Sequence, residues 1–125
     1  MIGSMRLGFL VLIGLAGCIT PSIPIPPPDP AEMNFHLTTS GTTSSAVFTY
    51  PAHDAYKGST AYILDQHTGQ GVFQIANADG SIGPSLPLPA SLGDQVVVTI
   101  QNTEQTVSAC VVLQEGAQNP NVYCQ

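Results

Sequence analysis

The amino-acid sequence predicts a small all-β domain, an antiparallel β-sandwich of about seven strands. From residue 33 onward, apolar residues alternate with polar ones or form short runs between turn-forming residues. The chain contains 12 glycines and 11 prolines, which favour short strands and many turns over helices. No window carries a sustained apolar stripe at helical spacing, and short strands separated by turns are typical of sandwiches and barrels.

The predicted strands follow one another from residue 34 to the end of the chain. The alternation is clearest late, where Val96, Val98 and Ile100 share one face of a strand and Val107, Ala109, Val111 and Leu113 share a face of the next. Asp79-Gly80 favours a tight hairpin turn. The strands are expected at 34–38, 46–50, 59–64, 72–76, 81–86, 95–101 and 106–113, with a short segment at 122–124.

Two turn motifs within residues 59–113 carry a family resemblance. Asp79-Gly80-Ser81 stands before one predicted strand, and Gly93-Asp94 stands before the next. This order resembles the carboxypeptidase regulatory-like and related immunoglobulin-like β-sandwich modules of bacterial cell-surface proteins. The resemblance implies an immunoglobulin-like sandwich over residues 33–125. In such modules these residue pairs shape turns and do no catalysis.

Residues 1–17 have the order of an export signal. A short positively charged start ending at Arg6 is followed by the apolar stretch 7–15 and then by small residues. An uncleaved membrane helix is the alternative. A helix over residues 7–20 would be about 21 Å long at about 1.5 Å per residue, which is too short for a hydrocarbon core of about 30 Å. The prolines from Pro21 onward prevent its continuation.

The stretch Leu15-Ala16-Gly17-Cys18 resembles the lipobox of bacterial lipoproteins. The resemblance implies a diacylglycerol thioether on Cys18, cleavage before Cys18 and acylation of the new amino group. Two or more acyl chains hold a protein stably on a bilayer, so the membrane is an expected partner through lipid alone. The implied location is the bacterial cell envelope, and Ile19, standing where an aspartate would suggest inner-membrane retention, favours the outer membrane.

Residues 18–32 are predicted to be the lipidated cysteine and a proline-rich tether. Residues 21–30 include six prolines and should populate polyproline II. At about 3.1 Å per residue such a segment spans roughly 30 Å. We interpret it as a spacer that lifts the domain off the lipid surface. The alternative is a ligand for a proline-binding groove.

Cys110 and Cys124 are the cysteines that remain once Cys18 carries lipid. An even count in an oxidising compartment predicts a disulfide. If Val112 pairs with Val122 in antiparallel strands, Cys110 faces Cys124 with Cα atoms about 4.5–5.5 Å apart, inside the range of about 4.4–6.8 Å that a disulfide accepts. Closing a loop of about 15 residues contributes roughly 3 kcal/mol. Two free thiols or metal binding are the alternatives.

The charge of the exported chain excludes nucleic acid as a partner. With Arg6 removed, Lys57 is the only strong cation against eight carboxylates, and an acidic protein repels polyphosphate. No nucleophile elbow, phosphate loop or zinc-protease motif is present, so we expect no enzyme and no cofactor. A metal site could use the three histidines with Asp54 or Asp65, but His36, His53 and His67 lie in different segments without the short spacing of metal ligands. A calcium loop is not expected at Asn77, Asp79 and Gly80, where the residues indicate a turn.

These observations predict a lipid-anchored structural or interaction module, with carbohydrate or envelope-polymer binding as the alternative. An interaction module should expose an apolar patch or a free sheet edge to an envelope protein. A glycan binder should expose aromatic rings on one face. We expect most of the aromatic candidates to be buried in the core. They are Phe35, Phe48, Tyr50, Tyr56, Tyr62, Phe73 and Tyr123.

Overall fold

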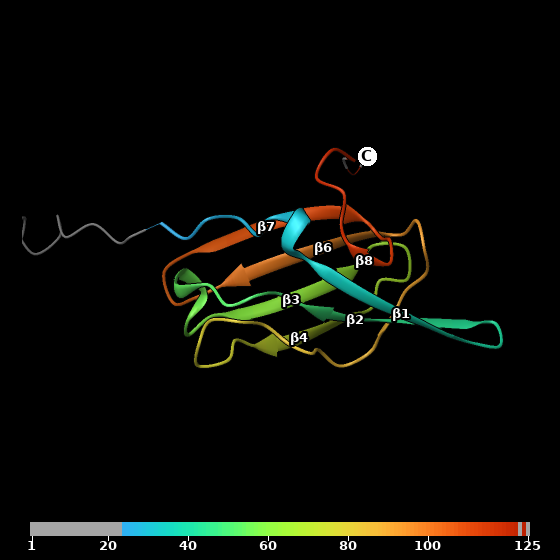
Figure 1. Cartoon of the computed structure of the whole chain (residues 1–125), viewed down its shortest axis with the longest axis horizontal. Helices are drawn as coiled ribbons and strands as arrows, with labels where there is room; N and C mark the ends of the chain where they lie inside the picture. Colours follow the sequence, from blue (N-terminus) through green and yellow to red (C-terminus); the bar gives the residue numbers. More distant parts are fainter. Residues whose placement is uncertain (1–23, 123, 125) are drawn as a thin grey trace, which may run out of the picture.

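The all-β prediction is confirmed by a computed structural model, which describes residues 24–122 and 124. Two antiparallel four-stranded sheets form a small sandwich, and Figure 1 shows β1 crossing over the strands of the other sheet. The strand orders are β5-β2-β1-β8 and β4-β3-β6-β7. The predicted export signal at 1–17 and the predicted lipidation site Cys18 lie outside the described residues.

Each sheet is built around a long central pair. The first sheet contains β1 (Asn34–Ser40), β2 (Thr43–Thr49), β5 (Leu88–Pro89) and β8 (Gly116–Ala117). The second contains β3 (Thr60–Asp65), β4 (Gly71–Ile75), β6 (Gln95–Gln101) and β7 (Thr106–Val112). Two short 3-10 turns complete the described part, η1 (Pro30–Glu32) and η2 (Asp54–Tyr56). Within that part, no helix has the length and apolar character needed to cross a membrane.

The core lies between the sheets, and period-two burial in the strands creates it. Val96, Val98 and Ile100 of β6 are fully buried, as their predicted common face requires. From the opposite sheet, Phe35 of β1 and Phe48 of β2 stand side by side with ring centroids 5.1 Å apart. These side chains form one hydrophobic cluster, which is the source of the domain's stability.

The predicted strand at 81–86 is wrong. Ile82 forms only an isolated bridge with Tyr50, and the short strand β5 begins later, at Leu88. Pro84 and Pro87 explain the difference, because proline has no N–H to donate to a ladder. The Asp79-Gly80 turn is present, and Gly80 has a φ of +83° with its Cα against the His53 backbone, where a Cβ would collide.

The predicted closing strand at 122–124 is also wrong. Val122 and Cys124 are not in strands, and the last strand is β8, which pairs with β1 and not with β7. Pro120 lies in a turn that interrupts any continuation. The cysteine pairing nevertheless holds, because Cys110 and Cys124 lie at disulfide-bonding distance with Cα atoms 5.9 Å apart. The C-terminal residues therefore reach β7 through an irregular loop.

The folded body begins before the predicted boundary at residue 33. Ile25 is buried in the core cluster, and its N–H donates to Gln105 Oε1 at 2.6 Å. The Tyr56 hydroxyl donates to the Pro26 carbonyl at 2.8 Å, and the Tyr50 hydroxyl accepts from the Asp29 N–H at 3.0 Å. Residues 24–32, predicted as part of a spacer, thus pack against the sandwich.

Candidate interaction surface

Four large apolar side chains are exposed together on the outer face of the second sheet. Tyr62 and Leu64 of β3 are 44% and 42% exposed, and Phe73 and Ile75 of β4 are 61% and 63% exposed. Tyr62 and Phe73 are directly paired across the two strands, with ring centroids 6.3 Å apart. We call these four residues the β3–β4 patch. Apolar surface gathered in this way marks interaction sites in soluble domains.

The rest of this outer face carries no charge. The strand register places Thr99 of β6 beside Tyr62 and Ser108 of β7 beside Thr99, and the two hydroxyl groups are 2.8 Å apart. The strand residues on this face include no acidic, basic or histidine side chain. They are Thr60, Tyr62, Leu64, Gly71, Phe73, Ile75, Gln95, Val97, Thr99, Gln101, Thr106, Ser108, Cys110 and Val112.

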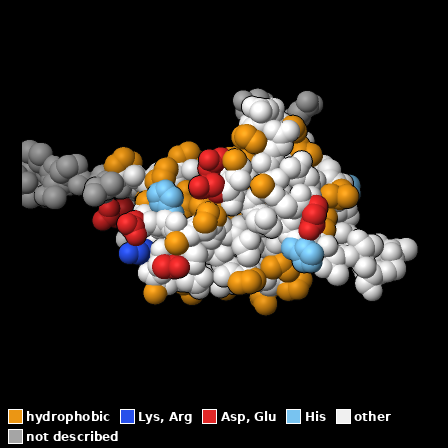
Figure 2. Space-filling model, in the orientation of Figure 1, with side chains coloured by type: hydrophobic (Ala, Val, Ile, Leu, Met, Phe, Trp, Pro, Cys, Tyr) orange, Lys and Arg blue, Asp and Glu red, His pale blue; other side chains and the backbone are white. Residues whose placement is uncertain are grey.

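A shallow hollow of about 220 Å³ adjoins the Tyr62 ring. Hydroxyl, amide and backbone groups line it, from Gly58, Thr60, Tyr62, Gln101, Asn102 and Thr103. An aromatic ring beside uncharged hydrogen-bonding groups is suited to a neutral polar ligand, because the ring supplies apolar contact and the amides fix orientation. In Figure 2, hydrophobic side chains also gather along the lower edge, where β4 and the following segment lie in Figure 1.

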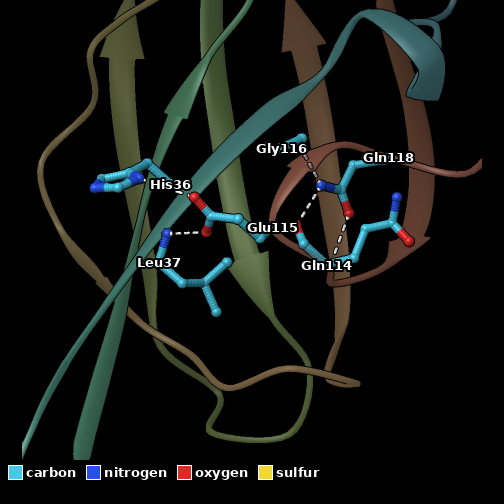
Figure 3. A network of polar contacts seen from close by, with 6 residues as sticks. All are labelled: His36, Leu37, Gln114, Glu115, Gly116 and Gln118. Atoms are coloured by element: carbon cyan, nitrogen blue, oxygen red, sulfur yellow. Dashed lines mark hydrogen bonds and ion pairs between the residues drawn. The ribbon is translucent and has the colours of Figure 1, made fainter.

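The exposed edge of β1 is closed by a polar network, shown in Figure 3. Glu115 accepts from the Leu37 N–H at 2.7 Å, and its other oxygen lies 2.9 Å from His36 Nδ1. The Leu37 N–H, and after it His36, lowers the pKa of the Glu115 carboxyl. Gln118 holds the loop by donating to the Gln114 and Gly116 carbonyls at 2.7 and 2.8 Å. The Glu115 carboxylate therefore accepts a hydrogen bond from the β1 backbone at Leu37, just beyond the residues of β1 that pair with β8.

The histidines singled out from the sequence lie in separate environments. His36 pairs with Glu115, and the His53 ring stacks on Tyr56 with centroids 4.8 Å apart. His67 lines a different hollow with Gln66, Gly93, Asp94 and Gln95. Among residues 24–122 and 124, no three His, Cys, Asp or Glu side chains are grouped so that they could hold a metal ion.

The aromatic candidates divide between core and surface. Phe35, Phe48, Tyr50 and Tyr56 are buried, and Tyr123 lies outside the described residues. Tyr62 and Phe73 are the exposed members of the set within the described part of the chain. Comparison with protein-family models, with curated proteins and with solved structures finds no match to this chain.

Two neighbouring aspartates, Asp65 at the end of β3 and Asp94 just before β6, differ in burial. Asp65 is fully buried, and its Oδ1 accepts from the His67 and Thr68 N–H groups at 2.7 and 3.1 Å. Burial, and after it the neighbouring Asp94 carboxyl, raises the pKa of Asp65. At Asp94 burial opposes the change, but the neighbouring Asp65 carboxyl and the hydrogen bond from the Ser91 N–H lower the pKa. The two neighbouring carboxyls therefore shift in opposite directions, with the pKa raised at Asp65 and lowered at Asp94.

Asp65→Asn is expected to gain stability over the natural protein as the pH rises from 4 to 7. A raised carboxyl pKa contributes stability below the unfolded pKa, and this contribution is lost as the pH rises through the folded pKa. Asparagine keeps an oxygen acceptor for the His67 and Thr68 N–H groups and does not ionise. The measurement is urea unfolding of both proteins at pH 4 and pH 7.

Asp79→Asn is the matched control, with the opposite expected trend. The Ser81 hydroxyl and N–H lower the pKa of Asp79, so its contribution is present at neutral pH and is lost as the pH falls. Its variant should therefore lose stability relative to the natural protein at pH 7. An Asp65→Asn protein that loses stability relative to the natural protein as the pH rises would contradict the raised pKa of Asp65.

Proposed function

We propose that this chain is a lipid-anchored interaction module of a bacterial cell envelope and that it binds its partner through the β3–β4 patch. The exposed patch is the observation that carries the proposal. Covering apolar surface is worth about 25 cal/mol per Å², and four adjacent exposed side chains supply such surface in one place. The proposal assigns no reaction to the domain.

The anchor in this proposal is Cys18, exposed by cleavage after the export signal 1–17. The lipobox-like run before Cys18 supports it, together with the nine apolar residues at 7–15. The outer membrane is the proposed location. The two-sheet arrangement is compatible with an immunoglobulin-like module, which we propose as the finer description of the domain.

Binding of a carbohydrate or another envelope polymer is the second candidate. The observation that favours it is the exposed Tyr62–Phe73 ring pair beside the hollow that contains Thr60 and Gln101. Aromatic rings offer flat apolar contact to the C–H face of a sugar, and neighbouring amides offer hydrogen bonds to its hydroxyl groups. The uncharged surroundings favour a neutral polymer.

The test compares two serine variants of the full chain in crosslinked cells. Phe73→Ser with Ile75→Ser removes half of the β3–β4 patch, and Leu92→Ser removes a 67% exposed leucine in the loop before β6. Crosslinked adducts with envelope proteins should disappear for the patch variant and persist for the Leu92 control. Adducts that are equally abundant in both variants would overturn the patch as the binding surface.

A polysaccharide-binding assay with two single variants separates the protein and carbohydrate candidates. Binding of purified chain to isolated envelope polysaccharide should be at background for the natural protein if the partner is a protein. A polymer binder should instead bind, and it should lose binding with Tyr62→Ala more than with Ile75→Ser, because the ring makes the sugar contact. That second pattern would replace the protein partner with a polymer.

A further inference from the structure

The outer edge of β4 is an unprotected sheet edge. The β3–β4 ladder is bracketed by hydrogen bonds from Ala76 N–H to the Ser59 carbonyl and from Asp65 N–H to the Gln70 carbonyl. Hydrogen-bonded pairs alternate along an antiparallel ladder, so Val72 and Gln74 face β3 while Gly71, Phe73 and Ile75 point their main-chain groups outward. The β4 segment contains no charge and no proline, the usual devices that block edge pairing.

Other chain segments cover much of the remaining edges of the two sheets. Segment 82–90 runs along β2, where the Ser85 N–H donates to Phe48 and the Ala90 N–H donates to Ser44. β8 and the Glu115 carboxylate close the first half of β1. The disulfide-linked Cys124 lies against β7, with its Sγ 3.5 Å from the Val111 carbonyl. Since β4 combines an open edge with exposed apolar side chains, it is the strand edge best suited to pair with a strand of another chain.

We propose that the β4 edge pairs with the β4 edge of a second copy of this chain, which deepens the proposed function by naming the partner of the β3–β4 patch. With Phe73 on the two-fold axis, Gly71 stands opposite Ile75 of the second copy. In this register the outward N–H and C=O groups of Gly71, Phe73 and Ile75 can all hydrogen-bond to the same strand of the second copy. Gln74 Nε2 lies 3.4 Å from the Ile75 carbonyl, a weak contact that pairing would replace.

Side chains and charge agree with this register. Gly71, Phe73 and Ile75 share the outer face, so the two Phe73 rings become cross-strand neighbours and the two β3–β4 patches join into one apolar strip. The whole chain has a formal charge of −6, so a second copy is repelled wherever carboxylates meet. The strand residues of the outer face carry no charge, and this is where an identical chain can approach. A cationic partner would find no counter-charge there.

A cysteine pair tests the register in the purified full chain under mild oxidant. Phe73→Cys should give a disulfide-linked dimer, because directly opposed residues have Cα atoms about 5.5 Å apart, which is within disulfide reach. Ile75→Cys is the matched control, since copies of residue 75 would stand about 14 Å apart along the strand at about 3.4 Å per residue. Peptide mapping should find the 73–73 linkage and no 75–75 linkage.

Sedimentation velocity over a concentration series tests the natural protein directly. The natural chain and Leu92→Lys should dimerise with rising concentration, whereas Phe73→Lys should remain monomeric because two like charges would meet on the axis. A natural chain that stays monomeric, or equal crosslinking at positions 73 and 75, would overturn self-pairing. Loss of cellular adducts in the Phe73 and Ile75 serine variant would still support the proposed function with a different partner.

Discussion

Phe48→Ala is expected to lower the free energy of unfolding by about 3–5 kcal/mol. Phe48 is 1% exposed, and its ring lies 5.1 Å from Phe35 and 6.4 Å from Tyr50 between centroids. Truncation removes the buried ring and leaves a cavity that the two packed sheets cannot fully close by moving together. Because small domains have about 5–15 kcal/mol of total stability, urea unfolding should show a large shift in midpoint with an unchanged slope.

Phe73→Ala is the control for this effect. It makes the same chemical change in β4, where the side chain is 61% exposed. At protein concentrations too low for two copies to pair, its effect on unfolding should stay within about 0.5 kcal/mol. Equal losses for Phe48→Ala and Phe73→Ala would contradict the assignment of one ring to the core and the other to the surface.

Cys18→Ala is expected to abolish acylation and to move the protein from the membrane to the soluble fraction. The proposed anchor is wholly lipid, and no described helix is able to replace it. The substitution alters none of the residues 24–122 and 124 that the structure describes. Cell fractionation and mass spectrometry of the purified protein provide the measurement.

Ser22→Ala is the control for the anchor, because it changes a nearby residue outside the lipobox-like run. It should leave both the acyl mass and the membrane fraction unchanged. A Cys18→Ala protein that remains membrane-bound and begins at Met1 would contradict the lipoprotein proposal, because the uncleaved export signal would then be the anchor.

The late strands were predictable because their burial is one-sided. In β6 the inward positions Val96, Val98 and Ile100 are all apolar, whereas the outward positions are glutamine or threonine except for Val97. The pattern itself therefore identifies the buried face. The segment 81–86 failed because prolines remove N–H donors at positions where the apolar pattern alone still indicates a strand. The pairing of Cys110 with Cys124 was predicted correctly, although the strand assumed for residues 122–124 is absent. An irregular loop brings Cys124 to β7 in its place.

The candidate surface was harder to predict. β3 contains the run Ala61-Tyr62-Ile63-Leu64, in which both faces are apolar, so alternation does not reveal which face is outside. The structure places Ala61, Ile63 and Asp65 inward, and a buried aspartate is contrary to the usual preference of carboxylates for water. The sequence therefore predicted that some aromatic residues would be exposed, but pairing of β3 with β4 was needed to identify Tyr62 and Phe73.

The packed N-terminal segment limits how far the domain can stand from its proposed attachment point. Ile25 is held in the core, so residues 19–23 alone link Cys18 to the part of the chain that is fixed to the sandwich. From Cys18 to Pro24 a fully stretched chain covers at most about 22 Å, at about 3.6 Å per residue. A domain fixed this closely would sweep a small area of the bilayer surface and would meet ligands that lie near the lipid headgroups.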